Sequence, residues 1–226
     1  MHVKLINYSQ GPFENCMGVN VPSKRSLLDQ VAYCARVSNP SNQNNTETSE
    51  KLVRYLIKHQ HWSPLEMVSI CLEIETTRDI ARQIIRHRSF SFQEFSQRYA
   101  VADLGWELKE ARLQDTKNRQ NSIVTDDQML ANDWIRAQKR LLYAAEREYK
   151  WALENGIAKE QARAVLPEGL TVSRMYMNGT LRSWVHYIQL RSANGTQKEH
   201  QNVALACADA IEPVFPMIKE YVNEQS

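Results

Sequence analysis

One run of residues constrains the fold more than any other, because the stretch from Asp126 to Glu154 keeps a helical spacing of apolar side chains throughout. It is followed by Asn155-Gly156, a pair that commonly terminates helices. The pattern therefore predicts one long amphipathic helix. Four large apolar residues indicate a face that packs against the core or another subunit: Trp134, Leu141, Leu142 and Trp151.

The first half of the chain contains the strand signals. Residues 67–77 (MVSICLEIETT) alternate apolar and polar side chains, which predicts a strand with one buried face. Residues 2–9 (HVKLINYS) predict a shorter strand, and residues 89–99 (SFSFQEFSQRY) have the period-2 character of an extended segment. The expected buried face of the 67–77 strand consists of Val68, Ile70, Leu72 and Ile74.

Helices are expected between and after these strands. In the first half they cover residues 24–37, residues from Thr48 or Ser49 to about 60, and a run capped by Thr77. In the second half a short helix runs to Leu166-Pro167, and two more cover 172–190 and 196–212. There are no repeats and no linker, so we expect a single α+β domain over residues 1–226, with a mixed sheet and a long helical second half.

Composition excludes several classes of protein. Lys plus Arg is 28 and Asp plus Glu is 26, a net charge of +2, whereas a dedicated nucleic-acid binder usually has a larger basic excess. No apolar run approaches the roughly 18 residues of a membrane span. The N-terminus lacks the layout of a signal peptide. We therefore expect a cytoplasmic protein that binds neither nucleic acid nor membrane.

Cysteine and glycine usage also limits the chemistry. The four cysteines are far apart and form no CxxC, so neither a disulfide framework nor a zinc site is expected. Three of them are expected in the core, and Cys16 lies in a polar loop: the three are Cys34, Cys71 and Cys207. The seven glycines include no G-x-G, which excludes a Rossmann nucleotide site.

The densest polar segment runs from Arg86 to Tyr99. Arg86, His87 and Arg88 stand where a predicted helix gives way to extended chain, and guanidinium groups bind phosphate bidentately. If residues 92–99 are extended, Glu94, Ser96 and Arg98 point to one side. The segment is therefore a candidate anion site, although charge runs of this kind are often only surface ion networks.

The whole segment resembles the signature of the flavin-dependent thymidylate synthases, RHRxxSxNExSxRY. Eight positions agree in register, and Gln93 replaces the usual Asn: the eight are Arg86, His87, Arg88, Ser91, Glu94, Ser96, Arg98 and Tyr99.

The resemblance extends along most of the chain. Residues 61–66 (HWSPLE) are similar to the family's H-x-[ST]-P-F-E-H, with Met67 in place of the last His. Residues 163–167 (RAVLP) resemble its R-x-x-L-P, and residues 181–191 resemble its helix ending in a functional Arg, with Thr180 where Asn is usual. Gln83 falls where the family has a nucleotide-binding Gln, and 197–199 resemble its closing Q-x-E.

The resemblance implies a homotetramer with shared active sites, FAD as cofactor, and NADPH and 5,10-methylenetetrahydrofolate as co-substrates in the methylation of dUMP to dTMP. Arg191 is implied as the catalytic group that favours the N3-deprotonated uracil. The implied FAD-binding residues are His61, Ser63, Arg86, His87, Arg88, Glu94, Arg182 and His186. The implied dUMP-binding residues are Gln83, Arg86, Glu94, Ser96, Gln97, Arg98, Arg163 and Arg191. No metal is implied.

Two alternatives stay open from the residues alone. A helical nucleotide- or RNA-binding protein could use the same basic cluster, but the low net charge and Glu94 count against it. A dUMP phosphohydrolase would need a carboxylate cluster for Mg²⁺, and Asp126-Asp127 has no such pattern.

Overall fold

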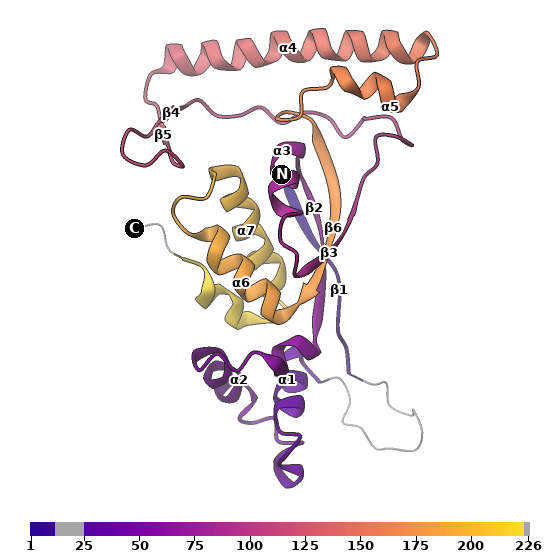
Figure 1. The fold of residues 1–226 in the computed structure, drawn as a ribbon. Coiled ribbons are helices and arrows are strands. Elements are labelled where there is room, and N and C mark those ends of the chain that lie inside the picture. Colours follow the sequence, from indigo (N-terminus) through magenta and orange to yellow (C-terminus); the bar gives the residue numbers. More distant parts are fainter. Residues whose placement is uncertain (12–24, 224–226) are drawn as a thin grey trace.

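The computed structural model describes residues 1–11 and 25–223. Its centre is a four-stranded sheet in the order β1-β2-β6-β3 (Figure 1). The strands are β1 (His2–Tyr8), β2 (Ser69–Thr77), β3 (Phe90–Glu94) and β6 (Val172–Thr180). The predicted α+β class is confirmed, but the predicted mixed sheet is wrong, because each neighbouring pair of these strands is antiparallel.

The sheet has one buried face. Side chains along β2 and β6 alternate between buried and more exposed positions. Leu72 is fully buried, as the alternation predicts, and pairs with the buried Met177 of β6. Helices α6 (Leu181–Ser192) and α7 (Lys198–Ile211) lie together on one side of the sheet in Figure 1. The site described below forms where these helices meet the chain leading into β3.

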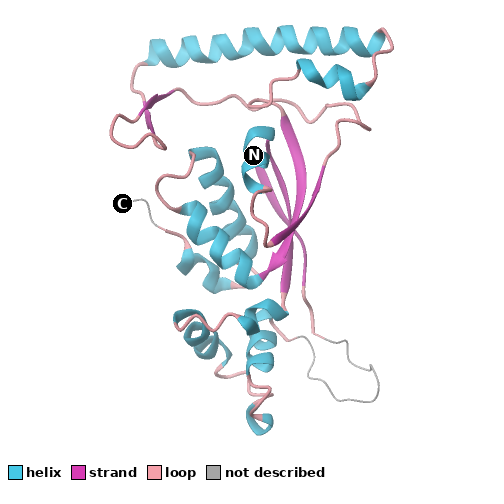
Figure 2. Ribbon diagram, in the orientation of Figure 1, coloured by secondary structure: helices cyan, strands magenta, loops and turns pink. Residues whose placement is uncertain are grey.

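The other helices lie toward the two ends of the sheet (Figure 2). Helices α1 (Leu27–Ala35) and α2 (Ser49–Lys58) are at one end, and α4 (Gln128–Glu154) and α5 (Lys159–Ala162) are at the other. The remaining elements in the described residues are α3 (Arg78–Ile84), the hairpin strands β4 (Arg112–Gln114) and β5 (Ser122–Val124), and the 3-10 turns η1 (Pro40–Asn42), η2 (Ser63–Met67), η3 (Arg163–Val165) and η4 (Pro216–Tyr221).

The long predicted helix is confirmed as α4. The side chain of Asp127 accepts hydrogen bonds from the first free backbone amides, Met129 N and Leu130 N, which fixes where the helix begins. Leu142 is buried, but Trp134 and Trp151 are 44% and 54% exposed, so among the described residues most of the predicted apolar face is not covered by another element.

The helix predicted over 172–190 is wrong in its first half, because residues 172–180 form β6 at the centre of the sheet. Helix α6 begins only after Thr180, whose hydroxyl accepts a hydrogen bond from Ser183 N. Tertiary pairing with both β2 and β3 overrides a local pattern that looked helical.

The extended segment predicted over 89–99 is too long. Strand β3 ends at Glu94, and residues 96–99 form a turn in which Ser96 O accepts from Tyr99 N at 3.1 Å. Glu94, Ser96 and Arg98 therefore do not share one strand face, contrary to the prediction. Thr77 does precede α3 as predicted, but its hydroxyl donates to the Asp79 carboxylate instead of capping the backbone.

The cysteines are less uniformly buried than predicted. Cys207 is fully buried, whereas Cys34 and Cys71 are only partly buried, and Cys16 lies outside the described residues. Burial raises the pKa of both the Cys71 and Cys207 thiols. Among the described residues, no helix is long and apolar enough to cross a membrane.

Candidate active site

Three neighbouring basic residues at the α3–β3 junction differ in their exposure to solvent. Arg86 and Arg88 are exposed, whereas the ring of His87 between them turns inward and is partly buried. The Arg191 Nε of α6 donates to His87 Nε2 at 2.9 Å. Two residues that are far apart in the sequence are thus in direct contact.

The His87 ring is held neutral. Burial, followed by the nearby Arg191 guanidinium, lowers the pKa of His87 from 6.5 to about 4. Because a guanidinium can only donate, His87 Nε2 must be the acceptor and Nδ1 carries the proton. The pair therefore keeps a cation beside a neutral imidazole at physiological pH.

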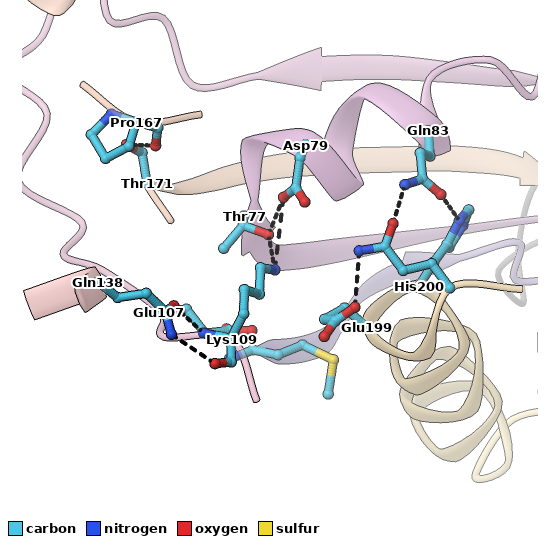
Figure 3. Close-up of polar contacts among 12 residues, drawn as sticks. Thr77, Asp79, Gln83, Glu107, Lys109, Gln138, Pro167, Thr171, Glu199 and His200 are labelled. Atoms are coloured by element: carbon cyan, nitrogen blue, oxygen red, sulfur yellow. Dashed lines mark hydrogen bonds and ion pairs between the residues drawn. The ribbon is translucent and has the colours of Figure 1, made fainter. Parts of the chain in front are cut away.

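A second set of hydrogen-bonded polar side chains, part of which is drawn in Figure 3, reaches this pair through Tyr187. Gln83 Nε2 of α3 donates to Gln197 Oε1 at 2.7 Å, and Gln83 Oε1 lies 3.2 Å from His200 Nδ1. His200 Nε2 lies 3.1 Å from the hydroxyl of Tyr187, whose ring packs edge-on to His87. Gln83 and Arg191, which were predicted to bind dUMP, and His87, which was predicted to bind FAD, are therefore brought together.

We expect the free energy of unfolding to fall by about 3–4 kcal/mol between pH 7 and pH 5. Burial lowers the pKa of His200 to about 3, and that of His87 to about 4. The unfolded chain, with histidine pKa near 6.5, then binds more protons in this window, so stability is lost as pH falls below about 6.5. Urea unfolding across this pH range measures the effect, and an unchanged midpoint would contradict it.

A second cluster lies where η2 meets α6. The Trp62 ring packs edge-on against His186 with centroids 4.5 Å apart, and the Arg182 guanidinium lies 6.0 Å from the Trp62 centroid. Arg182 also pairs with Glu66 of η2. His61 and Ser63, on either side of Trp62, are exposed, so this part of the chain presents flat rings beside a cation.

Glu94, which was predicted to bind FAD and dUMP beside Arg86 and Arg88, contacts other side chains in the structure. Its carboxylate accepts from Ser173 Oγ at 2.9 Å and lies 3.6 Å from guanidinium nitrogens of both Arg78 and Arg82. Burial lowers the pKa of Arg78, and the Glu94 charge partly offsets that effect. Glu94 thus anchors the end of β3 to α3.

The third cluster follows the turn after β3. Arg98 Nε lies 3.6 Å from a carboxylate oxygen of Glu160, and Arg163 Nε donates to the Glu160 carbonyl at 3.3 Å. Arg98 N donates to Ser96 Oγ at 3.4 Å, and Gln97 is buried. Arg98 and Arg163, both predicted for the phosphate, therefore flank one acidic residue.

Most of the predicted site residues fall into three separate groups within one chain, and Glu94 lies apart from them with Arg78 and Arg82. The groups are centred on Arg191, on Arg182 and on Arg98. Four contacting residues had no role assigned from the sequence, and only their position in the fold reveals them: Trp62, Arg78, Tyr187 and His200. A group of three or more His, Cys, Asp or Glu side chains that could hold a metal is absent from residues 1–11 and 25–223.

Known proteins with similar sequences point in one direction. The model of the family described as thymidylate synthase complementing protein matches residues 25–217. A probable flavin-dependent thymidylate synthase of Paramecium bursaria Chlorella virus 1 is 47% identical over 227 residues, covering 99% of each chain. A flavin-dependent thymidylate synthase of Synechocystis sp. is 49% identical over 188 residues, covering 83% of this chain and 86% of its own length.

A solved structure agrees with these relatives. It is a UMP/dUMP methylase, PolB from Streptomyces cacaoi, bound with 5-Br dUMP, and it matches with a TM-score of 0.77 and 28% identity. The match covers 97% of this chain and 93% of that one. Together with the geometry above, these matches show that the chain is a methyltransferase and belongs to the flavin-dependent thymidylate synthase family.

Proposed function

We propose that this enzyme converts dUMP to dTMP by reductive methylation, with 5,10-methylenetetrahydrofolate as carbon donor and NADPH-reduced FAD as hydride source. The observation that supports it most is the Arg191–His87 contact, to which Gln83 is linked through His200 and Tyr187. A fixed guanidinium next to a neutral ring suits a uracil that gains negative charge at N3.

The residues proposed to bind dUMP come from the groups centred on Arg191 and on Arg98. Arg191 and Gln83 are proposed to contact the uracil, while Arg98, Arg163 and Ser96, with Gln97 behind them, hold the phosphate. The Glu160 carboxylate now pairs with Arg98, and the Glu160 backbone carbonyl accepts from Arg163, so a bound phosphate would replace both contacts as the shared anionic partner of the two guanidiniums.

The chain's side chains fit FAD without a glycine-rich loop. Arg86 and Arg88 are exposed cations suited to a pyrophosphate, and the Trp62–His186–Arg182 group suits a flat ring system. His61, Ser63, His87 and Glu94 complete the proposed set. Bound FAD would supply the hydride, and these residues would orient it and exclude water.

The proposed assembly is a homotetramer of single-domain chains with active sites shared between subunits. The exposed tryptophans of α4 supply an apolar face for such contacts, and the three site clusters are separate within one chain, two of them along α6 and one after β3. The proposal needs no metal, nucleic acid or membrane. Because its substrates are small water-soluble molecules, we place the enzyme in the cytoplasm.

The proposed route uses no cysteine nucleophile. Burial raises the pKa of Cys71 and Cys207, which disfavours the thiolate, and Arg191 has His87 rather than a thiol as its partner.

The decisive measurement is dTMP formation from dUMP and methylenetetrahydrofolate, with and without NADPH and FAD. We expect a purified protein with flavin absorption, and product only when NADPH is supplied and the flavin, bound or added, is present. Product formed at full rate without flavin would overturn the proposal. UMP as a parallel substrate tests the choice of sugar.

We expect Arg88→Ala to weaken FAD binding more than dUMP binding. Arg88 is exposed beside β3. Losing one charged hydrogen bond to a phosphate costs about 1.5–3 kcal/mol of binding free energy, which raises the Kd for FAD roughly 10- to 100-fold. Titration of both ligands measures it, with Arg54→Ala on the remote surface of α2 as a control. Equal weakening of the two ligands would show that the cluster is misassigned.

We expect Ser96→Ala to raise the KM for dUMP by roughly 2- to 10-fold, the value of one neutral hydrogen bond, and to keep making dTMP. Ser96 lies in a turn, and the nearest predicted base, Glu94, is instead paired with Arg78 and Arg82. A nucleophilic serine would need an oriented base. Initial rates, with Ser91→Ala as control, test this. Normal binding of both ligands without any product would make Ser96 the nucleophile.

A further inference from the structure

A polar chain of side chains begins on the β4–β5 hairpin and ends in the core. Arg112 of β4 pairs with Glu199 Oε1, and both side chains are nearly buried, at 11% and 13% exposed. Glu199 Oε2 accepts from Gln197 Nε2 at 2.9 Å. Gln197 Oε1 accepts from Gln83 Nε2, and Gln83 Oε1 faces His200, which is fully buried (Figure 3).

The Glu199 carboxylate determines the donor and the acceptor of every hydrogen bond in this series of side chains. A carboxylate paired with a guanidinium only accepts, so Gln197 must turn its amide nitrogen to Glu199 and its oxygen to Gln83. Gln83 must then give its nitrogen to Gln197 and its oxygen to His200. His200 must therefore carry its proton on Nδ1, and its bare Nε2 accepts from the Tyr187 hydroxyl.

Tyr187 is compatible with this direction. Burial raises the pKa of Tyr187 well above 10, so the hydroxyl keeps its proton and can donate. Its ring packs against His87, the partner of Arg191. The chain that starts at Glu199 thus ends beside the proposed uracil site.

We propose that Glu199 is a positioning residue, which sets the direction of the Gln197 and Gln83 amides and thereby the tautomer of His200. The part of this inference that concerns dUMP binding by Gln83 rests on the proposed function. The fixed amide leaves Gln83 one N–H to offer, and a reversed amide would set a carbonyl oxygen against a uracil that gains negative charge. Glu199 itself touches neither substrate nor cofactor in this scheme.

The simpler alternative is that Glu199 only ties the hairpin to α7 through Arg112. Two variants separate the roles. Glu199→Gln can both donate and accept, so the direction of the chain is no longer fixed. Adding Gln197→Glu to it restores an acceptor-only group, now directly against Gln83 Nε2, while the carboxylate that pairs with Arg112 stays absent.

The His200 tautomer is read from ¹⁵N shifts of histidine-labelled protein by magic-angle-spinning NMR, with His200→Gln assigning the signal. We expect the Nδ1–H form in the wild type, a mixture with Nε2–H in Glu199→Gln, and the Nδ1–H form again in the double variant. The KM for dUMP should rise about tenfold in the single variant, with a smaller change in kcat, and should return to within about threefold in the double variant.

Arg112→Lys is the matched control, because it loosens the hairpin but keeps a cation beside Glu199, so the tautomer should not change. An unchanged tautomer in Glu199→Gln overturns the inference, and so does a double variant that behaves like the single one. If the tautomers change as expected while the KM for dUMP stays constant, the positioning role stands and the assignment of Gln83 to dUMP fails.

Discussion

Arg191→Ala should lower kcat/KM for dUMP by about 100- to 1000-fold, the cost of losing a hydrogen-bond donor to developing negative charge, about 2.7–4 kcal/mol. Arg191 Nε is already bound to His87, so its terminal nitrogens are held in place before substrate arrives. A donor positioned in advance needs no reorganisation when charge develops on the ring. FAD should stay bound, because Arg86, Arg88 and Arg182 are untouched.

Two measurements accompany the rate. Flavin absorbance of the purified variant reports FAD retention, and the pKa of His87 should rise, because one of the two causes that lower it is removed. Arg191→Lys keeps the charge but loses the planar fork, so an intermediate rate is expected. Wild-type turnover in Arg191→Ala, or loss of FAD with it, would show that Arg191 has another role.

Sequence patterns predicted the elements whose burial follows a simple period. Leu72 and Ile74 alternate cleanly because β2 has a core on one side only, and the pattern predicts the strand directly. The long run of α4 and the apolar spacing of α7 were equally readable. In each case the local sequence and the tertiary environment favour the same structure.

The pattern was misleading where distant contacts decide the structure. Strand β6 lies between β2 and β3, and its pairing is invisible from its own nine residues. The turn at Ser96 depends on backbone bonds that end the strand after Glu94. Alternation alone cannot show where pairing stops.

Some residues of the candidate site could be predicted from the sequence, and others could not. The signature identified Arg86, His87 and Arg88 together, but it could not show that His87 turns inward while both arginines stay exposed. His200 had no role from the sequence because its partners, Gln83 and Tyr187, are separated from it by 117 and 13 residues. Only the packing of α7 against α3 and α6 brings them together.

Gly179 lies in β6, the strand that was predicted to be helical, and it packs against the aromatic side chains next to the site. A Cβ there would lie 2.6 Å from Cε1 of Phe90 and closer still to Cδ1. The Phe90 ring cannot move away freely, because it packs edge-on against Trp184 and Tyr187 with centroids 4.8 Å and 5.9 Å apart. Glycine at this point therefore lets β3 pair closely with β6 below the aromatic cluster.

Gly179→Ala should destabilise the protein by about 3 kcal/mol, the upper part of the usual range for overpacking a core. Urea unfolding measures it, and Gly169→Ala is the matched control, since a Cβ there meets nothing within 4 Å and should change stability by less than about 0.5 kcal/mol. Combining Gly179→Ala with Phe90→Leu should recover part of the loss, because the smaller side chain makes room for the methyl group. If the double variant is less stable than the sum of its two single changes predicts, the clash with Phe90 is not the cause.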